Sequence, residues 1–154
     1  MKAWIRALFY RALFPVAKLF LITLGLRRDG ALVIISWEGK MLLIKNTYGS
    51  RYWTFPGGTM RRGESSEDAA KREVHEEVGI LLKEIKLISS LRGKHGTVHV
   101  FTGDSFGGKL ILDRGEVLDA KWIVPDQIKE NELSDVGAVA FKNFKSYKIG
   151  GLKN

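Results

Sequence analysis

The segment from Ser65 to Gly79 constrains the fold of this 154-residue chain more than any other part of it. Ser65 or Ser66 can cap the amino end of a helix, and Glu67 and Asp68 follow in the first turn, where acidic side chains favour helix formation. Gly79 is typical of the left-handed residue that ends a helix. Apolar residues recur between them at helical spacing, at Ala69, Ala70, Val74 and Val78. The sequence therefore predicts one helix, ending at about Val78, with a narrow buried stripe.

The polar side of this predicted helix carries three glutamates, Glu73, Glu76 and Glu77, which project from one face because they lie three and four residues apart. Like charges at this spacing repel, and neighbouring carboxylates raise one another's pKa unless a cation joins them. A hard dication such as Mg²⁺ or Mn²⁺ would remove that repulsion, because these ions prefer oxygen ligands. Arg72 can hold a carboxylate bidentately, and Glu64 lies in the preceding loop. A solvated acidic face paired with neighbouring basic residues is the alternative interpretation.

These residues follow a longer spacing pattern that is similar to the Nudix box. The motif requires Gly, five residues, Glu, seven residues, Arg-Glu, an aliphatic residue, any residue, Glu-Glu, any residue, Gly and an aliphatic residue. Its seven fixed positions are filled by Gly58, Glu64, Arg72, Glu73, Glu76, Glu77 and Gly79, and its aliphatic positions by Val74 and Ile80. At ordinary residue usage, seven identities at fixed spacing arise by chance about once in 10⁸. The sequence is therefore identified as a member of the Nudix family on residues 58–80, and its flanks extend the resemblance over roughly 31–130.

The resemblance implies both a fold and an activity. The fold would be α/β (α+β), an α/β/α sandwich around a mixed β-sheet. The activity would be metal-dependent hydrolysis of a diphosphate (pyrophosphate) linkage in a nucleoside diphosphate derivative or related organic diphosphate, by attack of water at phosphorus. The implied cofactor is Mg²⁺ or Mn²⁺, and the implied partner is a small-molecule nucleotide or organic diphosphate substrate.

Carried over position by position, the resemblance implies two overlapping sets of site residues. The metal ligands would be the backbone carbonyl of Gly58 and the carboxylates of Glu73, Glu76 and Glu77. The catalytic set would be Glu64, Arg72, Glu73, Glu76 and Glu77. Within that set Arg72 would orient the glutamates, and Glu64 would be a supporting ligand or a candidate base. The identity of the general base varies within the family and stays open.

Other candidates lie outside the helix. Glu116 is a possible extra carboxylate of the site, and a surface carboxylate at a strand end is the alternative. Arg51 and Arg61, like Lys45, lie near the motif in sequence and could bind diphosphate oxygens, although a solvated surface role is the alternative. Tyr48 could stack on a nucleobase. We therefore expect substrate binding by Arg51, Tyr48 and Arg61.

The flanking sequence predicts a sheet around this helix. Two apolar runs, 31–36 and 41–45, are joined by Glu38-Gly39 and indicate a β-hairpin. Aromatic residues over 53–58 end in Pro56-Gly57-Gly58, where the backbone can approach a ligand closely. Further strands are expected at 80–91, 98–101 and 118–124, and helices at 126–130 and 136–144. The basic tail from Lys142 to the last residue is expected to be a solvated end.

Charge separates the first part of the chain from the rest. The chain has 25 Lys+Arg against 17 Asp+Glu, a net charge of +8, which favours anionic partners. Residues 1–30 hold six basic side chains and one acidic side chain, so this stretch carries +5 and the remaining 124 residues carry +3. The near balance of the globular part therefore favours a small-molecule partner over nucleic acid, and nucleic acid stays open as an alternative. The absence of cysteine excludes disulfides, thiolate metal sites and thiol nucleophiles, and it fits a cytoplasmic location.

We divide the chain into an arm at residues 1–25, packed on or beside the domain, and a hydrolase domain at 26–154. Arg6, Arg11, Lys18 and Pro15 interrupt the apolar arm, so we expect neither a membrane span nor a secretory signal. Three interpretations remain open for the arm. It could form a short helix followed by a strand on the core, make peripheral membrane contact through residues 1–17, or form a homodimer contact.

Two other functions remain as alternatives to the diphosphate hydrolase. A Nudix fold could serve as a nucleotide-binding sensor, although such a module has no need of the full set of metal carboxylates. An RNA 5′-end pyrophosphohydrolase is the second alternative, and the positive charge permits it. Binding that falls steeply with salt concentration would favour the RNA enzyme.

Overall fold

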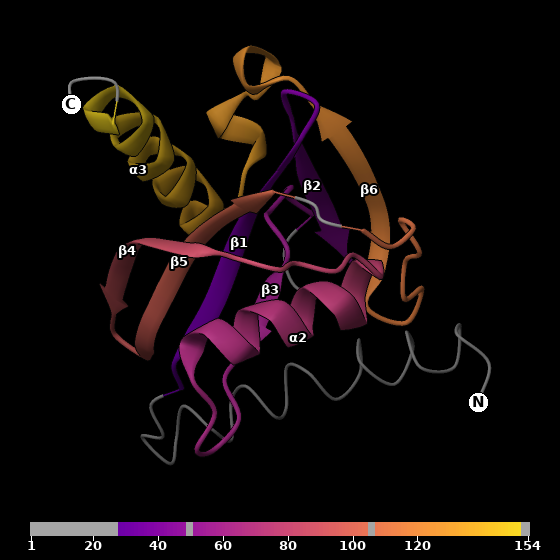
Figure 1. Ribbon diagram of the computed structural model, residues 1–154, viewed down its shortest axis with the longest axis vertical. Coiled ribbons are helices and arrows are strands. Elements are labelled where there is room, and N and C mark those ends of the chain that lie inside the picture. Colours follow the sequence, from indigo (N-terminus) through magenta and orange to yellow (C-terminus); the bar gives the residue numbers. More distant parts are fainter. Residues whose placement is uncertain (1–27, 49–50, 105–106, 152–154) are drawn as a thin grey trace.

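The computed structural model describes residues 28–48, 51–104 and 107–151 of the chain (Figure 1). The expectations for the arm at 1–25, namely its helix, its strand, its membrane contact and its dimer contact, lie outside the described residues. Within the described ranges, no helix is both long enough and apolar enough to cross a membrane.

A mixed β-sheet forms the centre of the described structure. Its strands are β1 (Gly30–Trp37), β2 (Lys40–Asn46), β3 (Gly57–Thr59), β4 (Lys86–Gly93), β5 (Gly96–Asp104) and β6 (Val117–Ile123). Their order is β4-β5-β1-β2-β6, and β3 pairs with β1. β1 and β5 run parallel, whereas the other pairs are antiparallel. The predicted hairpin is confirmed as β1 and β2, with the turn at Glu38-Gly39.

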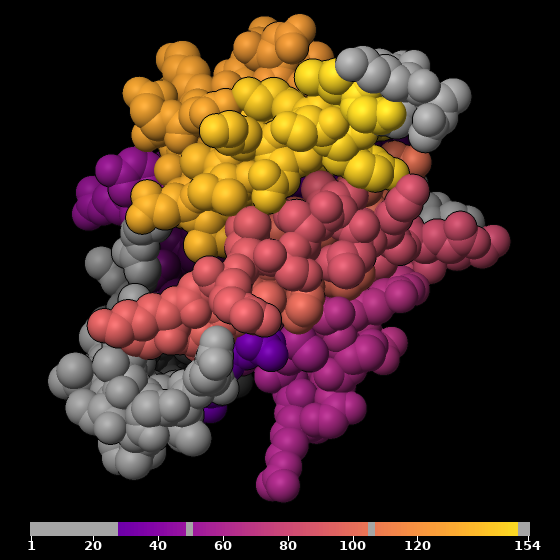
Figure 2. Space-filling view, turned by 90° about the vertical axis from the view of Figure 1, so that its left-hand side faces the viewer, coloured from indigo at the N-terminus to yellow at the C-terminus, as the bar shows by residue number. Residues whose placement is uncertain are grey.

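Helices α2 (Ser66–Val78) and α3 (Asp135–Gly151) each pack over a separate core of the sheet. Along β1, Ala31, Val33 and Ile35 join the core beneath α2, while Leu32 and Ile34 join the core beneath α3. Because β1 is buried on both faces, its sequence is an almost continuous apolar run. Figure 1 shows α2 and α3 as separate layers, and Figure 2 shows α3 lying along β4. The predicted sandwich around a mixed sheet is confirmed.

Helix α2 has the ends that the sequence predicts. The Ser65 side chain caps it by accepting a hydrogen bond from the Asp68 N–H at 3.0 Å. Gly79 ends it with φ 71°, in the left-handed region. Its apolar stripe is fully buried, at Ala69, Ala70, Val74 and Val78. The helix is therefore fixed at both ends and along one side, which gives its polar side chains a rigid base.

The strand predicted over 80–91 is wrong in its first half, because β4 begins only at Lys86. Ile80, Leu82 and Ile85 are apolar for another reason: they pack against the core beneath α2 as the chain leaves the helix. Hydrophobicity alone does not separate such a covering segment from a buried strand. The next strand is longer than predicted, since β5 covers nine residues around the expected 98–101.

The carboxyl-terminal part also differs from prediction. The helix expected at 126–130 is replaced by two short 3₁₀ turns, Pro125–Gln127 and Glu130–Glu132. The helix expected to end at Phe144 continues as α3 to Gly151, so the tail from Lys142 onward is helical in the described part. Phe141 and Phe144 anchor this helix in the second core, which explains why it does not end where its basic residues begin.

Candidate active site

Strand β3 brings two glycines between β1 and α2. Gly57 has φ 151°, and a Cβ there would collide with the backbone of Ala31 and Leu32. A Cβ on Gly58 would lie 2.5–2.7 Å from the carboxylate atoms of Glu73. Real Cβ contacts are not that short, so a side chain at Gly57 is blocked by fixed backbone and a side chain at Gly58 would displace the Glu73 carboxylate. The paired glycines therefore allow β3 to lie against β1 while the Glu73 carboxylate lies on the backbone of Gly58.

Glu77 is the one charged side chain that is buried in the described part of the chain, with 1% of its surface exposed. Its Oε2 accepts a hydrogen bond from the Gly57 N–H at 2.9 Å. Burial raises the pKa of Glu77 well above its ordinary value of 4.5, and the Gly57 hydrogen bond only partly opposes this shift. Three nearby carboxylates raise the pKa further, those of Glu73, Glu116 and Glu76. The site thus holds the Glu77 carboxyl group away from solvent and among other negative charges.

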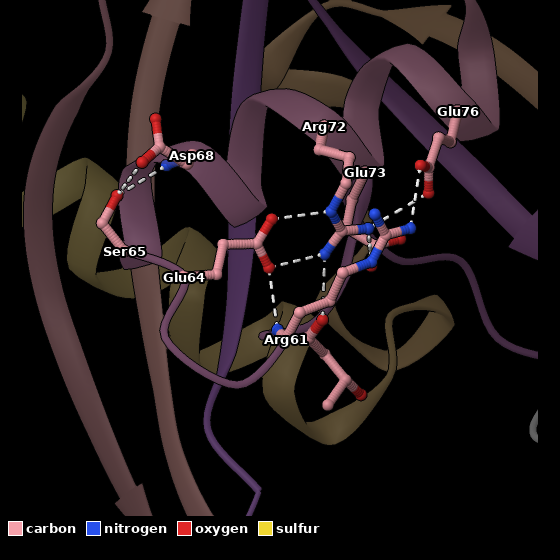
Figure 3. Close-up of polar contacts among 8 residues, drawn as sticks. Arg61, Glu64, Ser65, Asp68, Arg72, Glu73 and Glu76 are labelled. Atoms are coloured by element: carbon pink, nitrogen blue, oxygen red, sulfur yellow. Dashed lines mark hydrogen bonds and ion pairs between the residues drawn. The ribbon is translucent and has the colours of Figure 1, made fainter.

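Arg72 is the centre of the ion-pair network on α2 (Figure 3). Its Nε and Nη2 bind the two carboxylate oxygens of Glu64 at 2.7 and 2.9 Å. Its Nη1 donates to Glu73 at 2.7 Å and to Glu76 at 3.1 Å. These anionic partners raise the pKa of Arg72 above its ordinary value, with Glu64 as the largest cause. The orienting role that the resemblance implies for Arg72 therefore has a geometric counterpart.

Glu64 is held from two sides. Arg72 binds both of its oxygens, and the Arg61 N–H donates to Oε2 at 2.8 Å. These bonds, above all those to Arg72, lower the pKa of Glu64 from 4.5 to about 2. Glu73 shows the opposite behaviour, because its burial raises the pKa more than Arg72 lowers it. Two glutamates that share one arginine therefore differ in pKa, because Glu64 accepts three hydrogen bonds from the described residues that favour its charged form and Glu73 accepts one.

Glu116 reaches the site from the loop before β6. Its N–H donates to the Asp113 carbonyl at 2.9 Å, and its own carbonyl accepts from the Thr47 N–H at 2.9 Å. Its negative charge contributes to the raised pKa of both Glu73 and Glu77. The charge of the predicted extra carboxylate therefore acts on the helix glutamates, and its place in the site stays a prediction.

The three predicted substrate-binding residues differ in their contacts and in their exposure to solvent. The Arg61 guanidinium contacts Glu76 at 3.1 Å, and both side chains are exposed to solvent. Arg51 is exposed and Tyr48 is half-buried on the loop after β2. Their contacts with substrate stay predictions.

One arrangement near the site was not anticipated. The ammonium groups of Lys45 and Lys121 lie 4.6 and 4.1 Å from the centre of the Trp53 indole ring. Sequence analysis noted Lys45 but not Lys121, which is 76 positions away. The two lysines meet only because β2 and β6 are neighbours, and strand pairing cannot be read from a single sequence.

The donor set can be tested against a divalent metal ion. As placed, the described residues include no group of three His, Cys, Asp or Glu side chains arranged to hold an ion. In this arrangement Arg72 binds Glu64, Glu73 and Glu76, and Arg61 also binds Glu76. Glu77, in contrast, has Gly57 as its single hydrogen-bond donor within the described ranges. Carboxylate oxygens are the ligands that a hard dication prefers, and the buried charge of Glu77 has only that one described hydrogen-bond donor to offset it. The carboxylates present therefore fit such an ion, provided that the contacts of Arg72 and Arg61 with them open.

Comparison with known proteins identifies the family. The model of the NUDIX domain matches residues 26–144, more than half of the chain. A Bacillus subtilis relative named "Putative 8-oxo-dGTP diphosphatase" is 34% identical in an alignment over 109 residues that covers 65% of this chain and 68% of the relative. An RNA pyrophosphohydrolase of Proteus mirabilis is 40% identical over 68 residues, or 44% of this chain, and the match spans only 38% of that relative's length.

Solved structures agree with this assignment. The MutT NUDIX hydrolase of Burkholderia pseudomallei superposes with a TM-score of 0.69 at 25% identity, over 76% of this chain and 97% of that one. A NUDIX hydrolase of Nitrosomonas europaea shares the fold with a TM-score of 0.68 at 22% identity, over 82% of this chain and 74% of its own. With the family model, the fold and the motif residues in agreement, the chain belongs to the Nudix family and is a Nudix hydrolase.

Proposed function

We propose that this chain hydrolyses a diphosphate linkage in a nucleoside diphosphate derivative or related organic diphosphate, in a metal-dependent reaction. The buried carboxylate of Glu77 carries this proposal. A carboxylate that is removed from water and surrounded by like charges destabilises the folded state, and a residue with this cost indicates a functional role. Hydrolysis at phosphorus provides such a role, because it needs several carboxylates in one place to hold a metal ion and to accept a proton. Relatives named as a diphosphatase and as pyrophosphohydrolases support the reaction class.

Divalent metal ions are general among Nudix hydrolases, and we propose Mg²⁺ or Mn²⁺ here. The residues that would hold the ion are the Gly58 carbonyl, Glu73, Glu76 and Glu77, with Glu116 as a further carboxylate. When bound, such an ion neutralises phosphate charge and lowers the pKa of a water molecule. These donors belong to β3, α2 and the loop before β6, so the proposed site forms only when the protein is folded.

The chain's own groups divide the remaining work. Arg72 orients the carboxylates, because its planar fork fixes them in direction as well as in position. With a pKa near 2, Glu64 is a weak base at neutral pH and suits a holding role. Burial raises the pKa of Glu73, which makes it a better candidate than Glu64 for accepting a proton from the attacking water.

A terminal diphosphate on RNA is the second candidate substrate. Matches to proteins named RNA pyrophosphohydrolase favour it, although these matches cover 44% of the chain. The net charge of +8 is compatible with an RNA end. The sensor alternative finds less support, because every acidic position of the motif is filled. Membrane contact through residues 1–17, a homodimer and a cytoplasmic location stay predictions.

A substrate panel tests the proposal. Purified protein is incubated with nucleoside triphosphates, oxidised nucleotides, nucleotide sugars, dinucleoside polyphosphates and 5′-triphosphorylated RNA, with Mg²⁺, with Mn²⁺ or with chelator. Glu76→Gln is the test variant. Glu67→Gln is the matched control, because Glu67 lies on the same helix and pairs with Lys71 away from the network.

We expect metal-dependent turnover of one substrate class, unchanged in Glu67→Gln and at least about 100-fold slower in Glu76→Gln. Absence of turnover for every substrate, together with tight metal-independent nucleotide binding, would refute the hydrolase and support the sensor.

A further inference from the structure

Two lysines from neighbouring strands converge on one aromatic ring. Lys45 ends the apolar run of β2, Lys121 lies in β6, and Trp53 lies on the segment that leads into β3. Both ammonium groups are within 5 Å of the centre of the indole ring, at 4.6 and 4.1 Å. All three residues are half-buried, so part of each is exposed to solvent. We call these three residues the cationic cluster.

Strand register explains why the lysines face the same way. Leu43 is opposite Lys121 and Asp119 is opposite Lys45, so the two lysines are diagonal neighbours on one face of the β2–β6 pair. Leu43 belongs to the core beneath α3, and Trp53 packs against that core. The cationic cluster therefore lies on the α3 side of the sheet, outside the carboxylate network of α2.

The cluster carries more positive than negative charge, with two lysines beside one acid, Asp119, in the described structure. Among the described residues, Lys45 and Lys121 form no ion pair, unlike Lys71, Lys129 and Lys145. Asp119 is opposite Lys45 in the sheet, and its carboxylate accepts a hydrogen bond from the Ala120 N–H, so it offsets one of the two positive charges without forming an ion pair with a described residue. An indole face attracts a cation yet leaves its charge in place. Two neighbouring ammonium groups on one ring therefore favour binding of an anion.

The cluster also lies close to the proposed diphosphate site along the chain. Trp53 precedes Gly57 by four residues, and the Gly57 N–H holds Glu77. Four residues span at most about 14 Å between Cα atoms. At the other side, Lys45 is followed within two residues by Thr47, which is hydrogen-bonded to Glu116. One elongated substrate that contacts both the carboxylates and the cluster would therefore extend from the α2 side to the α3 side of the sheet.

We propose that Lys45 and Lys121, held over Trp53, bind a second phosphate group of the substrate, separate from the diphosphate that is cleaved. The substrate class is then a nucleotide that carries a further phosphate beyond its 5′-diphosphate, either as a 3′-phosphate monoester or as the phosphodiester of an oligonucleotide. Ammonium groups bind phosphate as point charges, and the indole offers apolar surface for the attached sugar. This inference rests on the proposed function, because it names the substrate of the same site.

Binding without metal tests the inference independently of turnover. Calorimetric titrations in chelator compare three probes: adenosine 5′-diphosphate, the same nucleotide with a 3′-phosphate, and a 5′-diphosphorylated dinucleotide. The variants are Lys45→Gln, Lys121→Gln and the pair combined. Lys86→Gln is the matched control, because Lys86 lies 5.2 Å from the Tyr147 ring on the far side of the sheet, at the β4 edge.

In wild-type protein and in Lys86→Gln, we expect the additional phosphate to raise affinity about tenfold or more over adenosine 5′-diphosphate. The double variant loses that gain but keeps its affinity for adenosine 5′-diphosphate. Lys45→Arg with Lys121→Arg restores the gain, which excludes loss of folding as the cause. The better of the two phosphorylated probes decides between the monoester and the phosphodiester. A wild-type protein with no gain, or a double variant that retains it, overturns the inference.

Steady-state kinetics separates this inference from the proposed function. With the preferred probe, the double variant should show a KM about tenfold higher and an unchanged kcat, because the second phosphate is remote from the reacting bond. If the wild-type protein hydrolyses the probe and the KM does not change in the double variant, the phosphate-binding role of the cationic cluster is contradicted and the proposed function stands. Wild-type protein that shows the binding gain but hydrolyses none of the probes contradicts the proposed function and leaves the phosphate site standing.

Discussion

At the residue scale, Glu77 destabilises the fold but is needed for the proposed reaction. The side chain is buried and has the Gly57 N–H as its hydrogen-bond donor in the described structure. A neutral side chain of the same shape would satisfy that donor without placing a charge among other carboxylates. Proteins commonly lose stability at functional positions for this reason.

The first prediction follows from the pKa of Glu77. Burial raises this pKa above the 4.5 of the unfolded chain, so the folded state binds more protons between the two values. Its contribution to stability is full below about pH 4.5 and is lost as pH rises through the folded pKa. Glu77→Gln should therefore raise the Tm of the metal-free protein by a few degrees at pH 8 and by less at pH 5.

Calorimetric scans of both proteins in chelator measure this difference. A Tm gain that is the same at both pH values would contradict the assigned cause, because only ionisation makes the gain depend on pH.

The second prediction concerns the shape of Arg72. Lysine keeps the charge but has no planar fork, so it cannot hold both oxygens of Glu64 and reach Glu73 as well. We expect Arg72→Lys to lower kcat at least about tenfold while the free energy of unfolding falls by about 1–2 kcal/mol. Initial rates and urea unfolding provide the two numbers. Wild-type kcat in this variant would show that charge alone is sufficient.

At the element scale, the short strand β3 joins the fold to the site. Its first glycine is fitted against the backbone of β1, and its second glycine lies against the Glu73 carboxylate. The two neighbours should therefore respond differently to the same substitution, one through folding and the other through catalysis.

The third prediction compares these two glycines. Gly57→Ala places a methyl group into fixed backbone and should destabilise the protein by about 3 kcal/mol or more. Gly58→Ala should destabilise it less, because a flexible side chain can move aside, yet it should lower kcat by displacing Glu73. Gly150→Ala is the control, since its surroundings in α3 are open. Equal losses of stability and activity at both positions would contradict this division.

Sequence was most informative where the determining contacts are local. The ends of α2 depend on Ser65 and Gly79 themselves, and the spacing of its glutamates follows from helical geometry, so both could be predicted. The segment containing Leu82 could not, because apolar residues that cover a core resemble those of a strand. Lys121 was missed because only the pairing of β2 with β6 brings it to Trp53.

At the scale of the whole molecule, the site depends on parts that are distant in sequence. Helix α2, strand β3 and the loop before β6 meet only when the sheet is complete. A ligand that binds this assembled site therefore binds the folded state and stabilises all of it. Metal binding can thus be measured as stability as well as activity.

The fourth prediction is stabilisation by Mn²⁺ or Mg²⁺. At a free ion concentration about 100 times the Kd, the folded state gains about 2.7 kcal/mol, or roughly 5–10 °C in Tm for a chain of this size. Glu77→Gln should lose most of this gain, whereas Glu67→Gln, on the same helix, should retain it. Thermal scans over a metal titration give the result. A Tm that rises equally in all three proteins would point to binding elsewhere.

The central claim is that the buried carboxylate on α2 serves metal-dependent hydrolysis of a diphosphate. The most direct measurement is the rate of product release from the preferred substrate by wild-type protein and by Glu77→Gln, with Mn²⁺ and with chelator. The account predicts turnover only by wild-type protein with metal, and a rate at least about 100-fold lower in the folded variant. Equal rates in the two proteins, or undiminished turnover in chelator, would contradict it.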